Sequence, residues 1–181
     1  MIFDPDNCLA IIAAYPDLRC TPQLVAWLNG IGVAQIVAHR LGGRLVTCAY
    51  NAGVLYALAS EYEQFIFADA DVWPGSETEP FLAAEYDAVG AEYDTGDEQA
   101  FKRPNEFHTA LWRTRRRVLE AVGARPFEWR MNETGTATID CPCNPFVRRI
   151  EAAGFAVGHA GHVLHIPRRQ GGLPSTVILS H

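Results

Sequence analysis

The sequence predicts one α/β domain in which a mostly parallel, mixed sheet is flanked by helices. Within the first 72 residues, short apolar runs alternate with segments of helical periodicity, which is typical of a doubly wound sheet. A chain of 181 residues, 49% of them hydrophobic, suits a single core. No run reaches the roughly 18 apolar residues of a membrane span, and Asp4 and Asp6 stand where a secretory signal carries basic residues. We therefore expect a cytoplasmic protein with one domain over residues 1–181 and no membrane span.

The first 72 residues supply this alternation. Apolar runs bounded by turn residues predict strands, and apolar residues at helical spacing predict helices. Thr21 is expected to be a helix N-cap, with Pro22 at the first helical position. The expected strands are Cys8–Tyr15, Ala34–His39, Leu45–Ala49 and Phe65–Val72, and the expected helices are 22–30 and 53–62.

The pattern is looser after residue 72, where the elements are shorter. Pro74-Gly75-Ser76 predicts a turn, and Gly123 and Gly154 are expected to end helices. The expected strands are 87–93, 108–112, 155–157 and 163–166, and the expected helices are 79–84, 114–122 and 146–153.

Five cysteines, at positions 8, 20, 48, 141 and 143, give an odd number with several in or near apolar runs. This favours reduced thiols over a disulfide framework. Cys141 and Cys143, with His159, His162 and His165, have side chains of the types that bind zinc. The Cys-x-Cys spacing differs from the familiar Cys-x2–4-Cys pairs, and histidines three apart on a strand alternate faces, so the sequence disfavours a zinc site.

The net charge of −6 is unevenly divided along the chain. Residues 1–100 hold 3 Arg and 15 acidic residues, whereas residues 101–181 hold 12 basic and 6 acidic residues. Two interpretations stay open: a chance gradient over solvated surfaces, or an acidic half that binds metal and a basic half that meets phosphate. Arginine favours bidentate phosphate contacts, so we expect some of the clustered arginines to bind a ligand phosphate. The clusters are Lys102-Arg103, Arg113 with Arg115–Arg117, Arg148-Arg149 and Arg168-Arg169.

The strand at Phe65–Val72 ends in two carboxylates, Asp69 and Asp71, separated by one residue. Ionised carboxylates beside a sheet core are tolerated mainly when a cation or hydrogen bonds compensate them. We therefore expect a divalent metal at this end of the strand, where open α/β sheets also bind their ligands. The alternative is an Asx pair that only caps the following segment.

Several short motifs follow one another in a recognisable order. They are Tyr15-Pro16-Asp17, Asn51-Ala52-Gly53, Asp69-Ala70-Asp71, and Asp140 with Gly154-Phe155. This order resembles the GT-A-fold glycosyltransferases, in particular the family-2-like enzymes that use nucleotide sugars. The resemblance spans roughly residues 8–168 and implies a single-domain, Rossmann-like GT-A fold. It also implies a hexosyltransferase that moves a sugar from a UDP-sugar such as UDP-glucose to an acceptor hydroxyl.

The resemblance implies a role for each residue at the metal. Asp71 would bind the ion directly, while Asp69 would bind the ribose or reach the ion through water. An imidazole from His165, with His162 as second choice, would complete the ligand set. Oxygen and imidazole ligands suit Mn²⁺, with Mg²⁺ as the other candidate, and such an ion would stabilise the departing diphosphate.

The resemblance also implies donor and acceptor contacts. Tyr15 and Asp17 would contact the nucleotide base and ribose, and Asn51 would belong to the donor site. Asp140 is the candidate general base of an inverting transfer, because a carboxylate must reach the acceptor hydroxyl. The sequence leaves open that Asp140 or Asn144 only caps the helix that follows.

The two halves of the chain would divide the reaction, with residues 1–93 binding donor and metal and residues 94–181 binding the acceptor. The basic second half is reminiscent of phage glycosyltransferases that modify hydroxymethylated pyrimidines in DNA, and a saccharide or small molecule is the other acceptor class.

Two alternative functions remain. A nucleotidyltransferase is disfavoured because residues 15–19 contain no glycine for a phosphate loop. A catalytically inactive module would bind a sugar nucleotide or a partner.

Overall fold

A computed structural model describes residues 2–14, 20–39, 46–93, 106–131, 133–134 and 138–165. Within these residues, the main sheet has the strand order β2-β1-β3-β6-β5-β9-β4, and β7 pairs with β8. The strands are β1 (Cys8–Ala14), β2 (Ala34–His39), β3 (Gln64–Asp69), β4 (Val72–Pro74), β5 (Ala88–Glu92), β6 (Leu111–Arg115), β7 (Arg130–Met131), β8 (Thr138–Asp140) and β9 (Val157–His165). In the main sheet only β4 and β6 run against the common direction, so the predicted mixed, mostly parallel sheet is confirmed.

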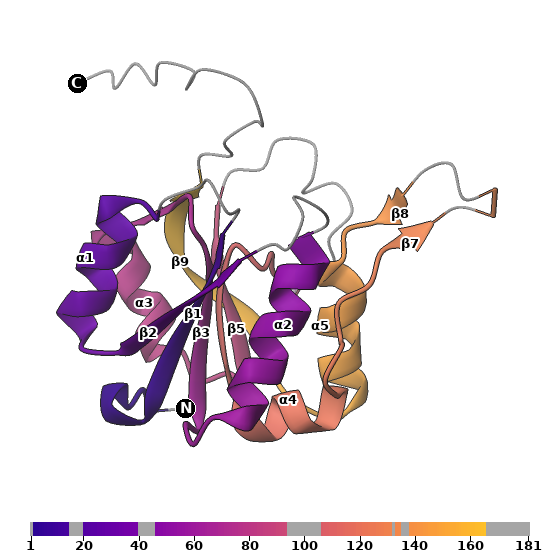
Figure 1. Ribbon diagram of the computed structural model, residues 1–181, viewed down its shortest axis with the longest axis horizontal. Coiled ribbons are helices and arrows are strands. Elements are labelled where there is room, and N and C mark those ends of the chain that lie inside the picture. The colour runs from indigo at the N-terminus through magenta and orange to yellow at the C-terminus, as the bar shows by residue number, and fades with distance from the viewer. Residues whose placement is uncertain are drawn as a thin grey trace, which may run out of the picture.

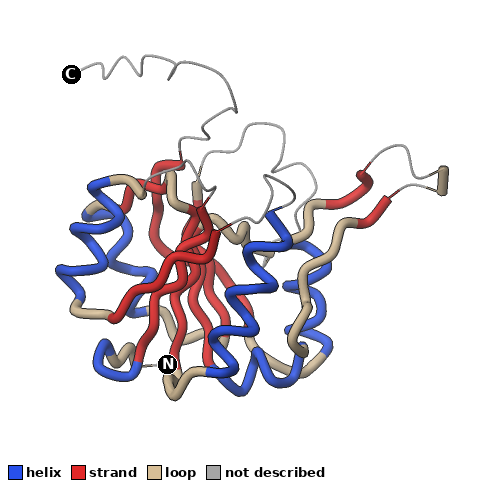
Figure 2. The backbone as a smooth tube through the Cα atoms, in the orientation of Figure 1, coloured by secondary structure: helices blue, strands red, loops and turns tan. Residues whose placement is uncertain are grey.

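Helices cover both faces of the sheet (Figure 1). Figure 2 shows the strands as one red layer between two blue layers of helix. On one face lie α1 (Pro22–Ile31) and α3 (Glu79–Ala83), and on the other lie α2 (Val46–Ala59), α4 (Arg116–Val122) and α5 (Cys143–Ala152). None of the helices in the described segments is long and apolar enough to cross a membrane.

The two faces of β1 explain the two hydrophobic cores. Successive strand residues point to opposite faces. Leu9 and Ile11 accordingly belong to the core beneath α2, α4 and α5, while Ala10 and Ile12 belong to the core beneath α1 and α3. All of β1 is buried, as expected for a strand covered on both faces.

The expected strand at 45–49 is wrong, because residues 46–59 form α2. Val46 and Thr47 favour strands locally, but the buried residues Thr47, Tyr50, Val54 and Ala57 recur at helical spacing. Packing of this stripe overrides the local preference. Gly53 permits the close approach, since a Cβ there would lie 2.9 Å from Ile11 Cγ2 and 3.2 Å from the Phe67 ring.

Several other element boundaries follow the sequence. The strand Ala34–His39 is confirmed. Thr21 caps α1 as predicted, and its hydroxyl accepts a hydrogen bond from the Leu24 N–H at 3.2 Å. The expected strand at 65–72 is instead divided by a turn into β3 and β4, and the two expected pieces near residues 155 and 166 belong to one strand, β9.

Candidate functional site

Three candidate metal ligands meet where β3 and β9 end. Asp69 is the last residue of β3, and Asp71 lies in the turn that leads to β4. Antiparallel pairing of β4 with β9 sets Val72 opposite His165, the last residue of β9. The fold thereby joins residues that are 94 positions apart in the chain.

The three side chains are close together and mostly buried. His165 Nε2 lies 3.2 Å from Asp71 Oδ1 and 3.9 Å from Asp69 Oδ2. One ligand atom from each residue lies within 4.8 Å of the other two. The side chains of Asp69, Asp71 and His165 are 14%, 13% and 15% exposed. Two carboxylates this close repel each other when ionised, and a bound cation would reverse that cost.

The donor set fits a hard or borderline divalent ion. Carboxylate oxygens suit Mg²⁺ and Mn²⁺, and an imidazole nitrogen favours Mn²⁺ of the two. Of the β9 histidines, His165 is the one beside the acids. His162 lies 3.8 Å from Glu77, and His159 pairs with Glu92. The three histidines have no carboxylate partner in common, as expected if they do not all converge on one site.

Tyr50 supports Asp69 and was not indicated by the sequence motifs. Its hydroxyl lies 2.6 Å from Asp69 Oδ1 and 2.9 Å from the Thr109 carbonyl oxygen, so its single proton serves these two acceptors. Burial, and after it the charge of Asp69, raises the pKa of Tyr50 well above its ordinary value, which keeps the hydroxyl protonated. The Asp69 N–H donates to the Ala110 carbonyl at 2.7 Å. The only available signal was that Tyr50 directly precedes Asn51-Ala52-Gly53.

The residues expected to contact the nucleotide sugar are Tyr15, Asp17 and Asn51, and the structure describes only the last of them. Tyr15 and Asp17 lie outside the described residues. The Asn51 side chain accepts from the Phe127 N–H at 3.0 Å and donates to the Phe127 carbonyl at 2.9 Å. These two bonds tie α2 to the segment after α4, which accounts for an amide at this position. A donor contact from Asn51 stays a prediction.

Asp140 ends β8, where it pairs with Arg130 of β7. Figure 1 shows this two-stranded pair outside the main sheet. Helix α5 begins at Cys143, three residues earlier than expected, and its N-cap residue is Pro142, which makes no side-chain capping hydrogen bond. The alternative in which Asn144 caps this helix is therefore wrong, because Asn144 lies inside the helix. Asp140 lies two residues before the N-cap, and a capping role for its side chain stays a prediction. The role of Asp140 as a base stays a prediction.

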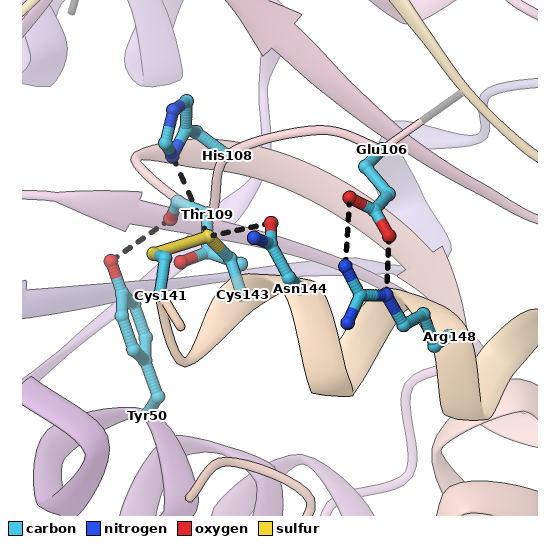
Figure 3. Close-up of a disulfide and its surroundings, with 8 residues drawn as sticks. All are labelled: Tyr50, Glu106, His108, Thr109, Cys141, Cys143, Asn144 and Arg148. Carbon is cyan, nitrogen blue, oxygen red and sulfur yellow. Dashed lines mark hydrogen bonds and ion pairs between the residues drawn. A yellow bond between two sulfur atoms is a disulfide. The ribbon is translucent and has the colours of Figure 1, made fainter. Parts of the chain in front are cut away.

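Cys141 and Cys143 are joined by a disulfide (Figure 3). The expectation of reduced thiols is wrong for this pair, whose Cα atoms lie 5.3 Å apart, within the range that a disulfide spans. Cys8, Cys20 and Cys48 are free thiols, as expected. Burial raises the pKa of Cys8 to about 12, so this thiol is inert at neutral pH.

The arginines at 115 and 116 lie far from the two acids. Because β6 runs antiparallel to β3, Arg115 pairs with Gln64, at the opposite end of β3 from Asp69. Arg116 follows and donates to backbone carbonyls around the C-terminal end of α2. The acceptors are Ala57, Leu58, Ser60 and Tyr62. Its guanidinium therefore satisfies carbonyls that a helix end leaves without intrahelical partners.

Arg113 plays the same part on the other face of the sheet. It is 1% exposed and donates to the carbonyls of Phe81 and Ala84 at the end of α3. Burial lowers its pKa to about 10, which still leaves it charged at neutral pH. Arg113 and Arg116 are therefore not among the clustered arginines that are placed to bind a ligand phosphate, because their guanidinium groups face the protein interior.

Other arginines of these clusters pair with carboxylates of this chain. The pairs are Arg117–Asp87, Arg148–Glu106 and Arg149–Glu128. Glu106 is buried, and its bond from Arg148 Nε, 2.6 Å long, ties α5 to the segment that continues to His108 and Thr109 (Figure 3). Lys102, Arg103, Arg168 and Arg169 lie outside the described residues.

The fold is similar to that of known structures, although no protein-family model and no curated protein matches the sequence. A Drosophila beta-1,4-galactosyltransferase 7 mutant, in complex with manganese, UDP-Gal and xylobiose, aligns with a TM-score of 0.58 at 17% identity over 91% of this chain and 72% of that one. The protein A197 from STIV aligns with a TM-score of 0.55 at 13% identity over 85% and 82% of the two chains. At such identities the likeness shows the fold, and the predicted GT-A type of α/β fold is confirmed.

Proposed function

We propose that this protein is a metal-dependent glycosyltransferase that uses a nucleotide-sugar donor. The observation that carries the proposal is the convergence of Asp69, Asp71 and His165 at the carboxyl end of a GT-A-type sheet. Their chemistry and spacing suit one Mn²⁺ or Mg²⁺ ion, and ligands of open α/β sheets bind at this edge. A similar fold holds manganese and UDP-Gal in the galactosyltransferase, so we take a UDP-sugar as the donor class.

The residues of the site would divide the reaction among them. Asp71, Asp69 and His165 would hold the metal, which as a Lewis acid would neutralise the charge that develops on the leaving diphosphate. Tyr50 would fix the rotamer of Asp69 through its hydrogen bond of 2.6 Å. The limited exposure of the three ligands would keep bulk water from the reacting bond.

The acceptor contacts belong to the same proposal. Asp140 would take the proton from the acceptor hydroxyl as it attacks the anomeric carbon, which gives inversion. Tyr15, Asp17 and Asn51 would contact the donor nucleoside. We propose one domain in which residues 1–93 hold most of the donor site, with His165 supplied by the second half, while residues 94–181 otherwise serve the acceptor.

The acceptor class is proposed as a hydroxyl compound, either a saccharide or a hydroxymethylated pyrimidine in DNA. Arg113 and Arg116 donate to backbone carbonyls inside the protein, so these two cations are not available to bind DNA phosphates. A saccharide acceptor therefore has the stronger support, and DNA is retained as one arm of the test.

A ligand screen tests the proposed donor class. The purified protein is heated with each of a panel of nucleotide sugars, with and without Mn²⁺, and the unfolding temperature is recorded. A ligand that binds only the folded state raises this temperature. We expect one UDP-sugar to do so in the presence of Mn²⁺, and we expect no such shift in Asp71→Asn. Absence of a metal-dependent shift from every nucleotide sugar would contradict the proposal.

Product analysis then separates the reaction classes. A glycosyltransferase releases UDP when a saccharide or hydroxymethylated DNA is added, whereas a nucleotidyltransferase releases pyrophosphate from a nucleoside triphosphate. An inactive binding module would bind the donor but release neither. Asp140→Asn should bind the donor normally and lose turnover if Asp140 is the base; normal turnover in this variant would remove that role.

A further inference from the structure

A second group of metal-binding side chains in the described segments consists of His108, Cys141 and Cys143 (Figure 3). One ligand atom from each residue lies within 4.8 Å of the other two, and His108 Nδ1 lies 3.5 Å from Cys143 Sγ. His108 comes from the segment before β6, whereas the cysteines lie at the start of α5. The zinc set considered from the sequence paired these cysteines with the β9 histidines, and the fold supplies His108 instead.

Two of the three candidate ligands are buried, and the third is partly exposed. His108 is 7% exposed and Cys143 is 1% exposed, whereas Cys141 is half-buried. An ion could therefore enter from the side of Cys141. Asn144 has no exposed surface, and its Oδ1 lies 3.7 Å from Cys143 Sγ. An asparagine amide offers an oxygen to a thiol or, after rotation, an NH₂ group to a thiolate.

We propose that His108, Cys141 and Cys143 form a thiol-rich zinc site that is filled when the two cysteines are reduced and is emptied when their disulfide forms. Thiolate and imidazole ligands favour zinc over the hard ions of a carboxylate site. Three protein ligands leave one position of a tetrahedral ion for solvent or another ligand.

The exchange between the two states is balanced. Two external thiols give two electrons and two protons to the Cys141–Cys143 bond, which yields two cysteine thiols and one external disulfide. Zinc then forms two Zn–S bonds and one bond to His108, and the two thiol protons leave to solvent. Oxidation by an external disulfide reverses the first step and releases the ion.

The zinc site would lie beside the carboxylate site. The Tyr93 ring centroid is 4.9 Å from the ring of His108 and 4.9 Å from the ring of His165. Asp140 directly precedes Cys141 in the chain. The redox state of the cysteines would therefore change the conformation of the backbone next to Asp140, the candidate base. Zinc binding does not itself require sugar transfer.

Cobalt substitution tests the proposal, because a Co²⁺–thiolate bond gives a charge-transfer absorption band that a carboxylate site cannot give. The full-length protein is reduced with a phosphine, separated from the reagent and titrated with Co²⁺. We expect one thiolate-bound Co²⁺ per chain, displaced by one equivalent of Zn²⁺, and no band in the oxidised protein. No band in the reduced protein would overturn the proposal, as would an equal band in the oxidised protein.

Single substitutions test which side chains bind the Co²⁺ ion. Cys141→Ser and His108→Asn should weaken or abolish the band, while Cys48→Ser, which changes an exposed free thiol, should keep it. Asp71→Asn should also keep the band, so loss of the proposed transferase activity and loss of the zinc site are distinguishable. An undiminished band in Cys141→Ser would overturn the proposal. Should a variant fail to fold, alkylation of the reduced wild type decides, since Zn²⁺ should protect the half-buried Cys141 but leave the exposed Cys48 reactive. Equal alkylation of Cys141 with and without Zn²⁺ would overturn the proposal.

Discussion

The two ends of the main sheet differ in the charge that they bury and in what surrounds it. Where β3 and β9 end, two aspartates and a histidine face one another within 4.8 Å. At the opposite end, Arg116 is surrounded by backbone carbonyls of the same chain. Arg116 donates its hydrogen bonds to carbonyl groups of the folded chain, so it contributes to the stability of the fold. The acidic end brings like charges together, which favours the binding of a cation from outside.

The largest effect on function is expected at the acidic end. Asp71→Asn keeps the shape of the side chain but removes the charge that would bind the metal. We expect turnover to fall by about 10³-fold or more, because Lewis-acid stabilisation of a leaving group is worth several kcal/mol. Steady-state assays of UDP release would measure this, and thermal unfolding should show little change. Wild-type turnover in this variant would show that the acidic end holds no catalytic metal, and the functional contrast between the two ends of the sheet would fail.

The largest effect on stability is expected at the opposite end. Arg116→Gln removes most of the hydrogen bonds that hold the C-terminal end of α2 and leaves acceptors unmatched. We expect a loss of about 3 kcal/mol in the free energy of unfolding, measured by urea denaturation. Metal affinity at the far edge should stay unchanged.

Arg117→Gln is the matched control for that change, because Arg117 is the next residue but its side chain is 57% exposed. A surface ion pair is worth at most about 1 kcal/mol. Equal losses in the two variants would show that Arg116 holds no special position, and the contrast between the two ends would fail.

A smaller effect is expected for Tyr50→Phe, which removes the hydroxyl next to Asp69. Loss of a group that orients a metal ligand typically weakens binding by about 10–100-fold, and loss of the hydrogen bond costs about 1 kcal/mol of stability. Metal titration and urea unfolding would measure the two effects. Tyr56→Phe is the control, since Tyr56 lies on the same helix but is 53% exposed. A loss of stability without a loss of metal affinity would separate Tyr50 from the site.

The smallest effect concerns Asp87, which Arg117 and the Ala156 N–H bind at the arginine end. Partial burial acts to raise the pKa of Asp87, but these hydrogen bonds and the charges of Arg117 and Arg115 lower it overall. The carboxylate therefore stabilises the fold above its ordinary pKa, and this contribution is lost as pH falls through the lowered folded-state value.

Unfolding temperatures of Asp87→Asn and the wild type should accordingly differ by a constant amount from about pH 7 to pH 5 and converge in more acidic solution. A difference that grows on acidification would contradict the sign of the pKa shift.

Local pattern was sufficient for much of the fold. Thr21 with Pro22, the run Ala34–His39 and the strand before Asp69 could be predicted because caps and apolar periodicity depend on neighbours in the chain. The segment 46–49 could not, since its helical state depends on packing against β1 and β3.

The candidate site likewise contains residues that a local pattern reveals and residues that only the fold brings together. Asp69 and Asp71 are visible from their place after a strand, and His165 was chosen through the resemblance. Tyr50 and His108 became visible only when distant segments met, because a lone tyrosine or histidine has no local pattern. The roles of Arg113 and Arg116 cannot be predicted for a related reason: they bind carbonyls of helix ends that lie far away in sequence.

Direct measurement of Mn²⁺ binding tests the central claim. Free Mn²⁺ gives a strong electron paramagnetic resonance signal that is lost on binding, so titration counts the sites. Glu77→Gln is the matched control, because Glu77 also faces a β9 histidine but is exposed. We expect one tight site per chain in the wild type and in Glu77→Gln, and no tight site when Asp69 and Asp71 are both changed to Asn. Unchanged Mn²⁺ binding in that double variant would contradict the account.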